Sequence, residues 1–311
     1  MIALSFIACK NEPASVPTVE VSTVDELKAA ITAADKKIVL TSDLELEKEL
    51  TIDCGKVVTL DLNGKSVKIP TDNGILVTGN GTELIISNGT VEAKFDGITT
   101  MEGGKLTINS GKIISSENIA VSTGVFYKNS KGEYVISKGE VVINNAEVYA
   151  PEFAVAVFGD SKLIINGGTF NSEDNAVIGT NGSSPMKDCK YDITINGGTF
   201  NGAIKTSGYI ACGIYMANTG KVTLNGGTFN IEGGIGVLVR SGDLEANKVT
   251  INLKEKAGLT EGKVGDSSIK ITTSSQIVIN DAAYPGAAPT ISKNETGYVV
   301  KNIDGTEYKA K

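Results

Sequence analysis

The chemistry open to this chain has to proceed without histidine, because its 311 residues include none. Without histidine the commonest general base is missing, and so are the usual Ser-His and Cys-His nucleophile systems. Two carboxylates on neighbouring strands could still hydrolyse a glycosidic bond if one is held protonated as the general acid. Five aspartates are candidates for such a pair: Asp160, Asp174, Asp188, Asp192 and Asp243. Each is explained equally well as a solvated turn residue, so both interpretations stay open.

Phosphate-binding motifs are incomplete in this sequence. Gly64-Lys65-Ser66 matches the end of a phosphate-binding loop, but Thr59 stands where the leading glycine is required. Gly233-Gly-Ile-Gly236 lacks the helix that would provide an anion site, so we predict a turn there. The formal net charge is −7, and a nucleic-acid partner would need clustered Lys and Arg. We therefore expect no nucleotide and no nucleic acid as ligand.

The four cysteines, Cys9, Cys54, Cys189 and Cys212, include no CxxC pair. With no histidine present, a zinc site is disfavoured. Cys189 and Cys212 could meet across adjacent coils, but the spacing does not establish disulfide geometry, and free thiols are the alternative. We expect no metal or other cofactor, and nothing in the sequence supports a Ca²⁺ site.

The amino terminus is apolar, reads Met1-Ile-Ala-Leu-Ser-Phe-Ile-Ala-Cys9, and is followed by Lys10. It resembles the end of a bacterial lipoprotein signal peptide, which closes on an Ala-Cys or Gly-Cys pair. Phe6 stands where that pattern prefers Leu, and the basic first region is missing. The resemblance implies a lipid anchor at Cys9, with residues 1–20 as signal remnant and tether. It also implies a surface-exposed lipoprotein of the bacterial cell envelope, or a secreted protein.

One phrase occurs three times in the middle of the chain and must be positioned by a repeating fold. The copies are Leu163-Ile-Ile-Asn-Gly-Gly-Thr-Phe-Asn171, Ile193-Thr-Ile-Asn-Gly-Gly-Thr-Phe-Asn201 and Val222-Thr-Leu-Asn-Gly-Gly-Thr-Phe-Asn230. Alternating apolar residues predict a strand with one buried face, and Asn-Gly-Gly predicts a sharp turn. Recurrence at this spacing is typical of a stacked solenoid.

Three columns extend this repeat along the chain. The first runs through Leu40, Leu62, Ile86, Ile108, Ile143, Ile165, Ile195, Leu224, Ile251 and Ile279. The next residue in register is usually Asn: Asn63, Asn109, Asn144, Asn166, Asn196, Asn225, Asn252 and Asn280, with Thr41 and Ser87 in the remaining coils. Five residues after the first column come Val67, Val91, Ile113, Val148, Phe170, Phe200 and Phe229. A third short strand follows in most coils, as in Gly74-Ile-Leu-Val77. We expect the Asn column to form a hydrogen-bonded ladder at one corner.

The predicted fold is all-β: a single-stranded right-handed parallel β-helix of about ten coils. Its opening, with Ile38-Val-Leu40 and Val58-Thr-Leu-Asp-Leu-Asn-Gly-Lys65, resembles the superfamily that includes pectate lyases and many bacterial surface proteins. We expect the β-helix domain over residues 21–280 and a C-terminal cap over residues 281–311. Residues 24–34 have helical spacing of apolar residues and a Thr23–Glu26 capping box, which predicts an N-terminal capping helix.

Insertions between coils are candidates for function, because insertions in solenoids gather on one face. Residues 122–140, 179–192 and 238–248 are expected at one corner, and Val125–Ile136 is typical of a hairpin. These insertions carry the candidate ligand-binding residues Phe126, Tyr127, Tyr134, Tyr191 and Arg240. The aromatic rings could stack on sugars or simply pack within the hairpin.

The sequence thus indicates an extracellular or cell-surface binding or adhesion protein that interacts with a polysaccharide or glycan. Two alternatives stay open. The resemblance allows a polysaccharide lyase or glycoside hydrolase, although a lyase would need clustered acidic Ca²⁺ ligands and Arg240 is the only arginine. A purely structural surface spacer is compatible with the same repeats. Oligomeric state does not follow from these patterns.

Overall fold

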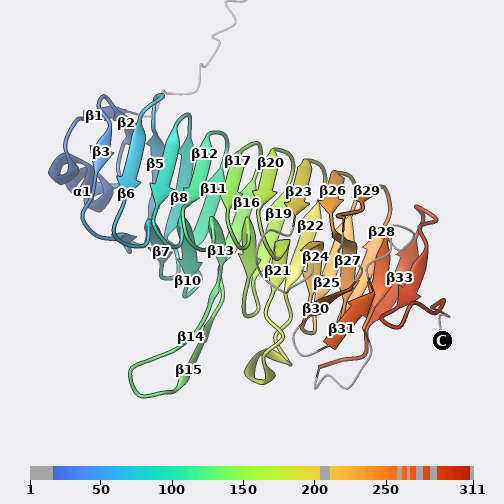
Figure 1. The fold of residues 1–311 in the computed structure, drawn as a ribbon. Helices are drawn as coiled ribbons and strands as arrows, with labels where there is room; N and C mark the ends of the chain where they lie inside the picture. Colours follow the sequence, from blue (N-terminus) through green and yellow to red (C-terminus); the bar gives the residue numbers. More distant parts are fainter. Residues whose placement is uncertain are drawn as a thin grey trace, which may run out of the picture.

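The computed structural model describes residues 17–203, 211–257, 261–264, 267–270, 276–280 and 286–308. Three long sheets of parallel strands, with 11, 9 and 10 strands, run side by side along the molecule (Figure 1). Consecutive strands of the chain pass from sheet A to sheet B to sheet C, and the next strand returns to sheet A one coil further on. The fold is therefore a single-stranded parallel β-helix, as the repeats predict.

Successive strands within one sheet come from successive coils of the chain. Sheet A contains β1 (Thr18–Val21), β2 (Lys37–Leu40), β5 (Val57–Asp61), β8 (Glu83–Ser87), β11 (Lys105–Ile108), β16 (Glu140–Ile143), β19 (Lys162–Ile165), β22 (Asp192–Ile195), β25 (Lys221–Leu224), β28 (Asp243–Ala246) and β33 (Thr290–Asn294). Sheet B contains β3 (Leu44–Glu45), β6 (Ser66–Ile69), β9 (Thr90–Ala93), β12 (Lys112–Ser115), β17 (Glu147–Ala150), β20 (Thr169–Ser172), β23 (Thr199–Ala203), β26 (Thr228–Glu232) and β29 (Thr250–Lys254). Sheet C contains β4 (Leu50–Ile52), β7 (Ile75–Thr78), β10 (Ile98–Met101), β13 (Val121–Thr123), β18 (Val155–Val157), β21 (Ala176–Thr180), β24 (Ala211–Met216), β27 (Gly234–Val239), β32 (Ile277–Ile279) and β34 (Val300–Asn302).

Two antiparallel hairpins lie outside the three sheets. β14 (Val125–Lys128) pairs with β15 (Tyr134–Ser137), which confirms the hairpin expected in the first insertion. β30 (Glu261–Val264) pairs with β31 (Ser267–Lys270) between sheets B and C. A short 3-10 helix, η1 (Ser184–Met186), lies within the second insertion.

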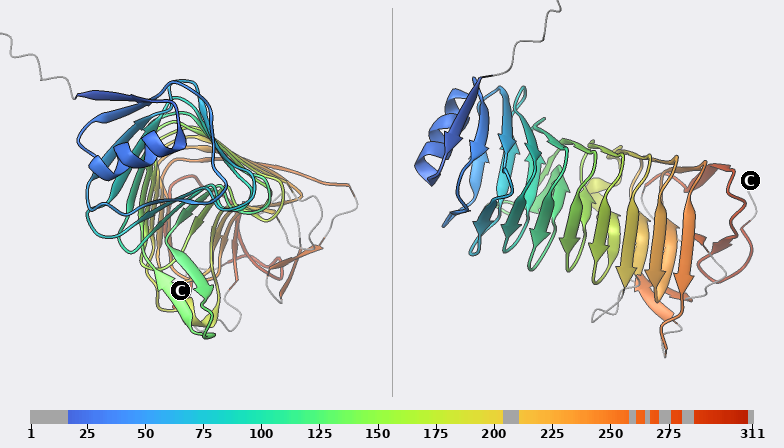
Figure 2. Two further views of the ribbon diagram at one scale, coloured as in Figure 1. Left: turned by 90° about the vertical axis from the view of Figure 1, so that its left-hand side faces the viewer. Right: turned by 90° about the horizontal axis from the view of Figure 1, so that it is seen from above.

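The interior of the coil is filled by in-register columns of apolar side chains. On sheet B the predicted column is confirmed: Val148 pairs with Phe170, Phe170 with Phe200, and Phe200 with Phe229. The three phenylalanines are fully buried, and their rings stack with centroids 4.8 and 4.4 Å apart. Because successive coils contribute apolar side chains at matching positions, most of the buried residues form one continuous cluster. Figure 2 shows how the coils stack one on the next along the molecule.

The corner between sheets A and B carries the expected asparagine ladder. The ladder begins at Asn109. In each later coil the side-chain amide donates to the asparagine of the coil before it, at 2.8–3.0 Å, and the donors are Asn144, Asn166, Asn196, Asn225 and Asn247. After Asn166, Asn196 and Asn225, a glycine pair turns the chain into sheet B. Gly198, for example, has φ of +111°, a conformation that side chains rarely adopt.

Two positions at the start of the first predicted column are wrong. Leu60 lies in register with Ile86, and Ile38 lies in register with Leu60. Leu40 and Leu62 therefore stand two residues beyond the column. These first coils have one more buried apolar residue before the corner than the later coils do. The prediction aligned this extra residue, instead of the one two positions earlier, with the column of the later coils.

Two positions at the end of the same column are also wrong. Ile251 lies in β29 of sheet B and pairs with Phe229, and Ile279 lies in β32 of sheet C. Consequently Asn252 and Asn280 do not continue the corner ladder.

The third predicted insertion, residues 238–248, is not an insertion. Residues 243–246 form β28, which pairs with β25 so that Leu224 lies opposite Ala246. This coil has the regular length and supplies Asn247, the last member of the corner ladder. The small Ala246 occupies the position at which other coils have Ile or Leu. A search for large apolar residues therefore does not detect the repeat in this coil.

The amino-terminal end of the stack is covered by α1 (Val24–Ala33), which confirms the predicted capping helix. Thr23 and Glu26 form the expected capping box, with the Glu26 amide donating to Thr23 Oγ1 at 3.2 Å. Leu27 and Ile31 bury the inner face of the helix. The structure places β1 across the boundary expected at residue 20. No helix in the described ranges is long and apolar enough to span a membrane.

The carboxyl-terminal end is closed by β33 on sheet A, by β34 on sheet C and by one side chain on sheet B. The Tyr298 hydroxyl accepts from the Ile251 amide at 3.0 Å and donates to the Val249 carbonyl at 3.0 Å. The Ile251 amide belongs to β29, at the edge of sheet B, and the Val249 carbonyl directly precedes this strand, so a further strand could bond both groups. Tyr298 therefore replaces part of a missing strand, within the segment expected as the cap.

We predict that Phe200→Ala lowers the free energy of unfolding by about 3–5 kcal/mol, because the cavity would interrupt the ring stack between two neighbours. Urea unfolding followed by circular dichroism measures this. Thr194→Ala, on the outer face of β22, is the matched control and should stay within about 0.5 kcal/mol of the parent. Equal losses for both variants would contradict the prediction.

We predict that Tyr298→Phe lowers the free energy of unfolding by about 1–3 kcal/mol, because one hydroxyl makes two hydrogen bonds to backbone that then stays unsatisfied. Hydrogen exchange of the Ile251 amide should accelerate more than exchange in β19 or β22. Tyr127→Phe, which removes a hydroxyl from an exposed tyrosine, serves as control. An unchanged Ile251 exchange rate would refute the capping role.

Candidate functional site

The candidate site is a groove on the outer face of sheet B, over the last five strands of that sheet. It has a volume of about 610 Å³. The residues that line it are Tyr149, Asn171, Ser172, Glu173, Asn201, Gly202, Ala203, Asn230, Ile231, Glu232, Asn252, Leu253 and Lys254. Adjacent strands of a sheet lie ~4.8 Å apart, so a groove from β17 to β29 is about 19 Å long. It runs along the axis of the β-helix.

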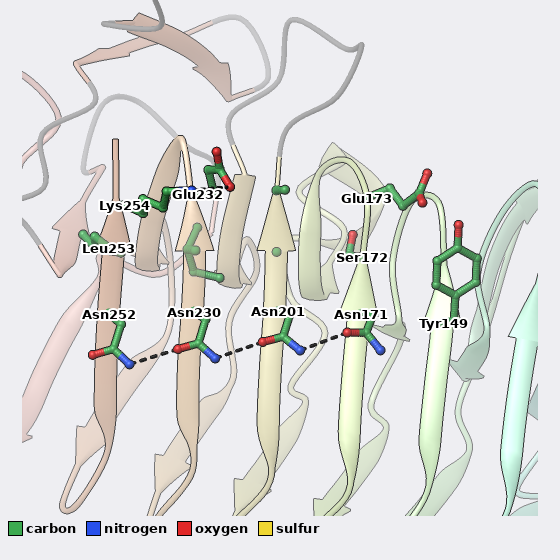
Figure 3. A pocket seen from close by; sticks show the side chains of 13 residues that line it. Tyr149, Asn171, Ser172, Glu173, Asn201, Asn230, Glu232, Asn252, Leu253 and Lys254 are labelled. Carbon is green, nitrogen blue, oxygen red and sulfur yellow. Dashed lines mark hydrogen bonds and ion pairs between the residues drawn. The ribbon is translucent and has the colours of Figure 1, made fainter. Parts of the chain in front are cut away.

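The floor of the groove is a second asparagine ladder. Asn252 donates to Asn230, Asn230 to Asn201, and Asn201 to Asn171, each at 2.9 Å (Figure 3). Each ladder bond uses one N–H of a side-chain amide and one lone pair of the next. The amides therefore keep a second N–H and a second lone pair for a ligand.

The apolar columns do not predict this second ladder, although the sequence carries a signal for it. In each copy of the repeat, Asn follows the buried Phe by one residue and so points to the opposite face of the strand. Asn252 was expected in the corner column, and the structure corrects this: it belongs to the ladder on sheet B. A parallel outer row two residues earlier consists of Thr169, Thr199, Thr228 and Thr250.

Charged and aromatic side chains stand at the two ends of the groove. At one end, Tyr149 lies in register with Asn171 and hydrogen-bonds Glu173. Burial of the hydroxyl, followed by the hydrogen bond and negative charge of Glu173, raises the pKa of Tyr149 to about 12. Tyr149 is therefore a neutral donor at physiological pH. At the other end, the Lys254 ammonium lies 3.4 Å from the Glu232 carboxylate.

A gap separates the two glutamates on the same rim. Ala203 lies in register with Glu232, and Glu232 with Lys254. Glu173 directly follows β20, whose last residue Ser172 pairs with Gly202. Glu173 and Glu232 are thus two coils apart, which corresponds to about 10 Å between their backbones. The small Ala203 side chain leaves the rim low between the two carboxylates.

The structure does not gather the five predicted ligand-binding residues into one site. Phe126 and Tyr134 stack within the hairpin, with ring centroids 5.4 Å apart and an interplanar angle of 7°. Tyr127 of the same hairpin is 47% exposed. Tyr191 is only 2% exposed, and its ring packs on Gly220, where any side chain would clash.

Arg240 lies further along the stack and hydrogen-bonds a residue of the neighbouring coil. Its Nη1 donates to the Tyr215 hydroxyl at 3.3 Å. The sheet A strands β16 and β19 separate the hairpin from Tyr191, and β22 and β25 separate Tyr191 from Arg240. The predicted residues therefore spread over about 19 Å of the axis. Only Phe126, Tyr127 and Tyr134 are close together.

Three of the five candidate aspartates have structural partners, Asp160, Asp188 and Asp243. Asp243 accepts from Thr290 Oγ1 at 2.8 Å and from Ser292 Oγ at 2.7 Å, and so ties β28 to β33. Asp160 accepts the Lys190 amide at 2.7 Å, and Asp188 pairs with Lys187. Among the residues that the structure describes, no three acidic or cysteine side chains converge on a metal position.

The three described cysteines, Cys54, Cys189 and Cys212, form no disulfide with one another. Burial raises the pKa of the Cys212 thiol well above its ordinary value, so it is not a nucleophile. Cys9, the expected lipid anchor, lies outside the described residues, and its modification stays a prediction.

Comparison of the chain with protein-family models, with curated proteins and with solved structures gave no match. The function therefore has to be argued from the groove itself.

One buried carboxyl makes stability depend on pH. Asp96, at the corner between sheets B and C, accepts from Asn118 Nδ2 at 2.6 Å. Burial raises the pKa of Asp96 more than this hydrogen bond lowers it, and the negative charges of Glu152 and Glu49 raise it further. The pKa of Asp96 therefore rises from 3.8 to about 6. The folded state thus binds a proton more tightly than the unfolded state. The free energy of unfolding should fall as pH rises through this window, by up to about 3 kcal/mol.

We predict that Asp96→Asn raises the melting temperature near pH 7.5 and has no stabilising effect near pH 4, where Asp96 is protonated in the folded state. Thermal unfolding of both proteins across this range measures the difference. Asp25→Asn, on the first turn of α1, provides an exposed control. A stability difference that does not change with pH would contradict the assignment.

Proposed function

We propose that this protein is a binding or adhesion protein that holds a linear polysaccharide in the groove of sheet B. The observation that carries the proposal is the amide ladder on the groove floor. A sugar hydroxyl donates and accepts hydrogen bonds, and each ladder amide offers one further donor and one further acceptor. The ladder bonds hold the amides in place, so little side-chain entropy is lost on binding.

The shape of the groove supports a chain-like ligand. It is open along the axis and about 19 Å long, which suits an oligosaccharide segment of a longer polymer. Tyr149 offers an aromatic ring at one end of the amide row (Figure 3). Aromatic rings are suited to apolar faces of ligands whose edges are polar.

The charges of the rim favour a neutral or basic polymer over a polyanion. Glu173 and Glu232 contribute two negative charges, and Lys254 contributes one positive charge that is paired with Glu232. A polyuronate would bring further carboxylates against this rim, and like charges at short range repel. Membership of the pectate-lyase-like superfamily, location at the bacterial cell envelope and the Cys9 anchor are parts of the same proposal.

The hydrolase alternative can be tested in the same groove. Two carboxylates on one rim are the residue type that glycoside hydrolases use, and a backbone separation of about 10 Å is slightly longer than the distance of about 6.5–9.5 Å between the carboxyl groups of inverting enzymes. Binding and cleavage are separated by incubating the protein with a bound polymer and analysing the products for shortened chains or new reducing ends. Product formation that requires Glu173 and Glu232 would replace the binding proposal by a hydrolase.

We predict that Asn201→Ala weakens polysaccharide binding at least about tenfold, because it removes the central amide and disorders its two neighbours. Affinity electrophoresis against β-glucan, xylan, mannan and polygalacturonate identifies a ligand, and calorimetry then measures the affinity of each variant.

Asn196→Ala is the matched control, since Asn196 lies in the same coil and also makes two ladder bonds, but at the corner between sheets A and B. Both variants should lose similar stability, and only Asn201→Ala should lose affinity. Equal affinity for both variants would place the ligand elsewhere.

A further inference from the structure

The hairpin β14–β15 concentrates the exposed apolar surface of the described chain. Five large apolar side chains are prominently exposed among the described residues, and three of them lie here: Tyr127 at 47%, Tyr134 at 50% and Ile136 at 37%. The hairpin projects away from the body of the stack (Figures 1 and 2). Tyr134 and Ile136 lie on one face of the hairpin and Tyr127 lies on the other, so both faces of the projecting element offer apolar contacts.

The same hairpin is basic in an otherwise acidic protein. Within Val125–Ser137, Lys128 and Lys131 outnumber Glu133, which gives the hairpin a net charge of +1 against −7 for the whole chain, and Lys138 follows directly after it. Lys128 is next to the exposed Tyr127 in sequence. The occupant of this surface should therefore be anionic and also able to accept apolar side chains.

The hairpin is held rigidly at both ends. At the tip, Asn129 Oδ1 accepts the amides of Lys131 and Glu133 at 2.9 and 3.0 Å, which closes the turn. At the base, Ser137 Oγ accepts the Glu102 amide and the Lys138 carbonyl accepts the Gly103 amide. An ordered projecting hairpin can bind without first having to fold.

An anionic sugar polymer fits this surface less well than a lipid surface. The ring of Tyr134 is already engaged, since Phe126 stacks on it and the Lys128 ammonium lies 4.8 Å from its centroid. Ile136 has no ring to offer a sugar. At the boundary between lipid headgroups and acyl chains, by contrast, tyrosine rings and aliphatic groups are buried while lysines reach the phosphates.

We propose that the hairpin β14–β15 is a docking element for an anionic lipid surface, independent of the polysaccharide groove. It leaves the stack at the corner between sheets C and A, which lies opposite sheet B in the order of the coil. Docking through this corner would leave the groove facing away from the membrane. Lipid contact would thus orient the groove towards the surroundings.

The test is sedimentation of the full chain, carrying Cys9→Ser to exclude acylation, with two kinds of vesicle. One is phosphatidylcholine alone, and the other contains equal parts of phosphatidylcholine and phosphatidylglycerol. Binding should require phosphatidylglycerol and weaken with added salt. Lys131→Glu with Lys138→Glu should reduce the partition coefficient at least about tenfold, since each lysine near an anionic surface adds measurable affinity.

Lys36→Glu with Lys48→Glu is the control of equal charge change on exposed lysines of the body, and it should retain binding. Tyr127→Ser with Ile136→Ser should also weaken binding, because it removes apolar contacts without changing charge. Vesicle binding unaffected by the hairpin variants, or lost equally in the control, would overturn the proposal. Binding of soluble polygalacturonate through the hairpin, without vesicle binding, would assign the element to an anionic glycan and equally overturn it.

Discussion

In-register stacking between successive coils is the interaction on which every other part of this structure depends. A single coil of about 22 residues buries too few side chains to offset the conformational entropy of ordering it. Each coil therefore becomes stable only when its neighbours bond its backbone and cover its side chains, as in other solenoids. The charges outside the sheets follow the same register, since Lys105 of β11 pairs with Glu140 of β16 at 2.8 Å, and Lys112 of β12 with Glu147 of β17 at 2.7 Å. Such exposed pairs add little stability, but they disfavour a pairing that skips one coil, in which Lys105 would meet Lys162.

Stacking creates two ends at which the backbone is open, and the chain closes them with different devices. At the amino-terminal end a helix with a complete capping box covers the first coils. At the carboxyl-terminal end, the Tyr298 hydroxyl bonds the Ile251 amide of β29 and the Val249 carbonyl just before it, and no further strand of the described ranges pairs with this edge. Both devices reduce the tendency of an open sheet edge to pair with another molecule. The helix was predictable from spacing and capping residues. The role of Tyr298 was not, because it depends on a contact between residues far apart in the chain.

Prediction from the sequence was accurate where the repeat is regular. Between Ile86 and Leu224 the columns were assigned correctly, because large aliphatic or aromatic residues recur at the same offset on both sides of a short turn. The assignment failed where that combination is absent. At Ala246 a small residue replaced the expected aliphatic side chain, and the alignment passed to Ile251 in the neighbouring sheet. The hairpin aromatics were correctly placed on a projecting segment. However, burial of Tyr191 and the contact between Arg240 and Tyr215 depend on tertiary neighbours that spacing does not reveal.

The groove was missed for a physical reason that also explains its usefulness. Residues of one strand alternate between the two faces of the sheet, so the phenylalanines that fix the register from inside also fix the asparagines outside. Phe200 and Asn201 are successive residues of β23, one in the ring stack and the other in the amide ladder. An apolar pattern detects only the first of these. A ligand surface built on the back of the core inherits the spacing and rigidity of the core, and insertions at the corners can then vary without moving it. The regular coils would thus bind a polymer whose units repeat. The projecting hairpin would instead make a contact that does not depend on the spacing between coils.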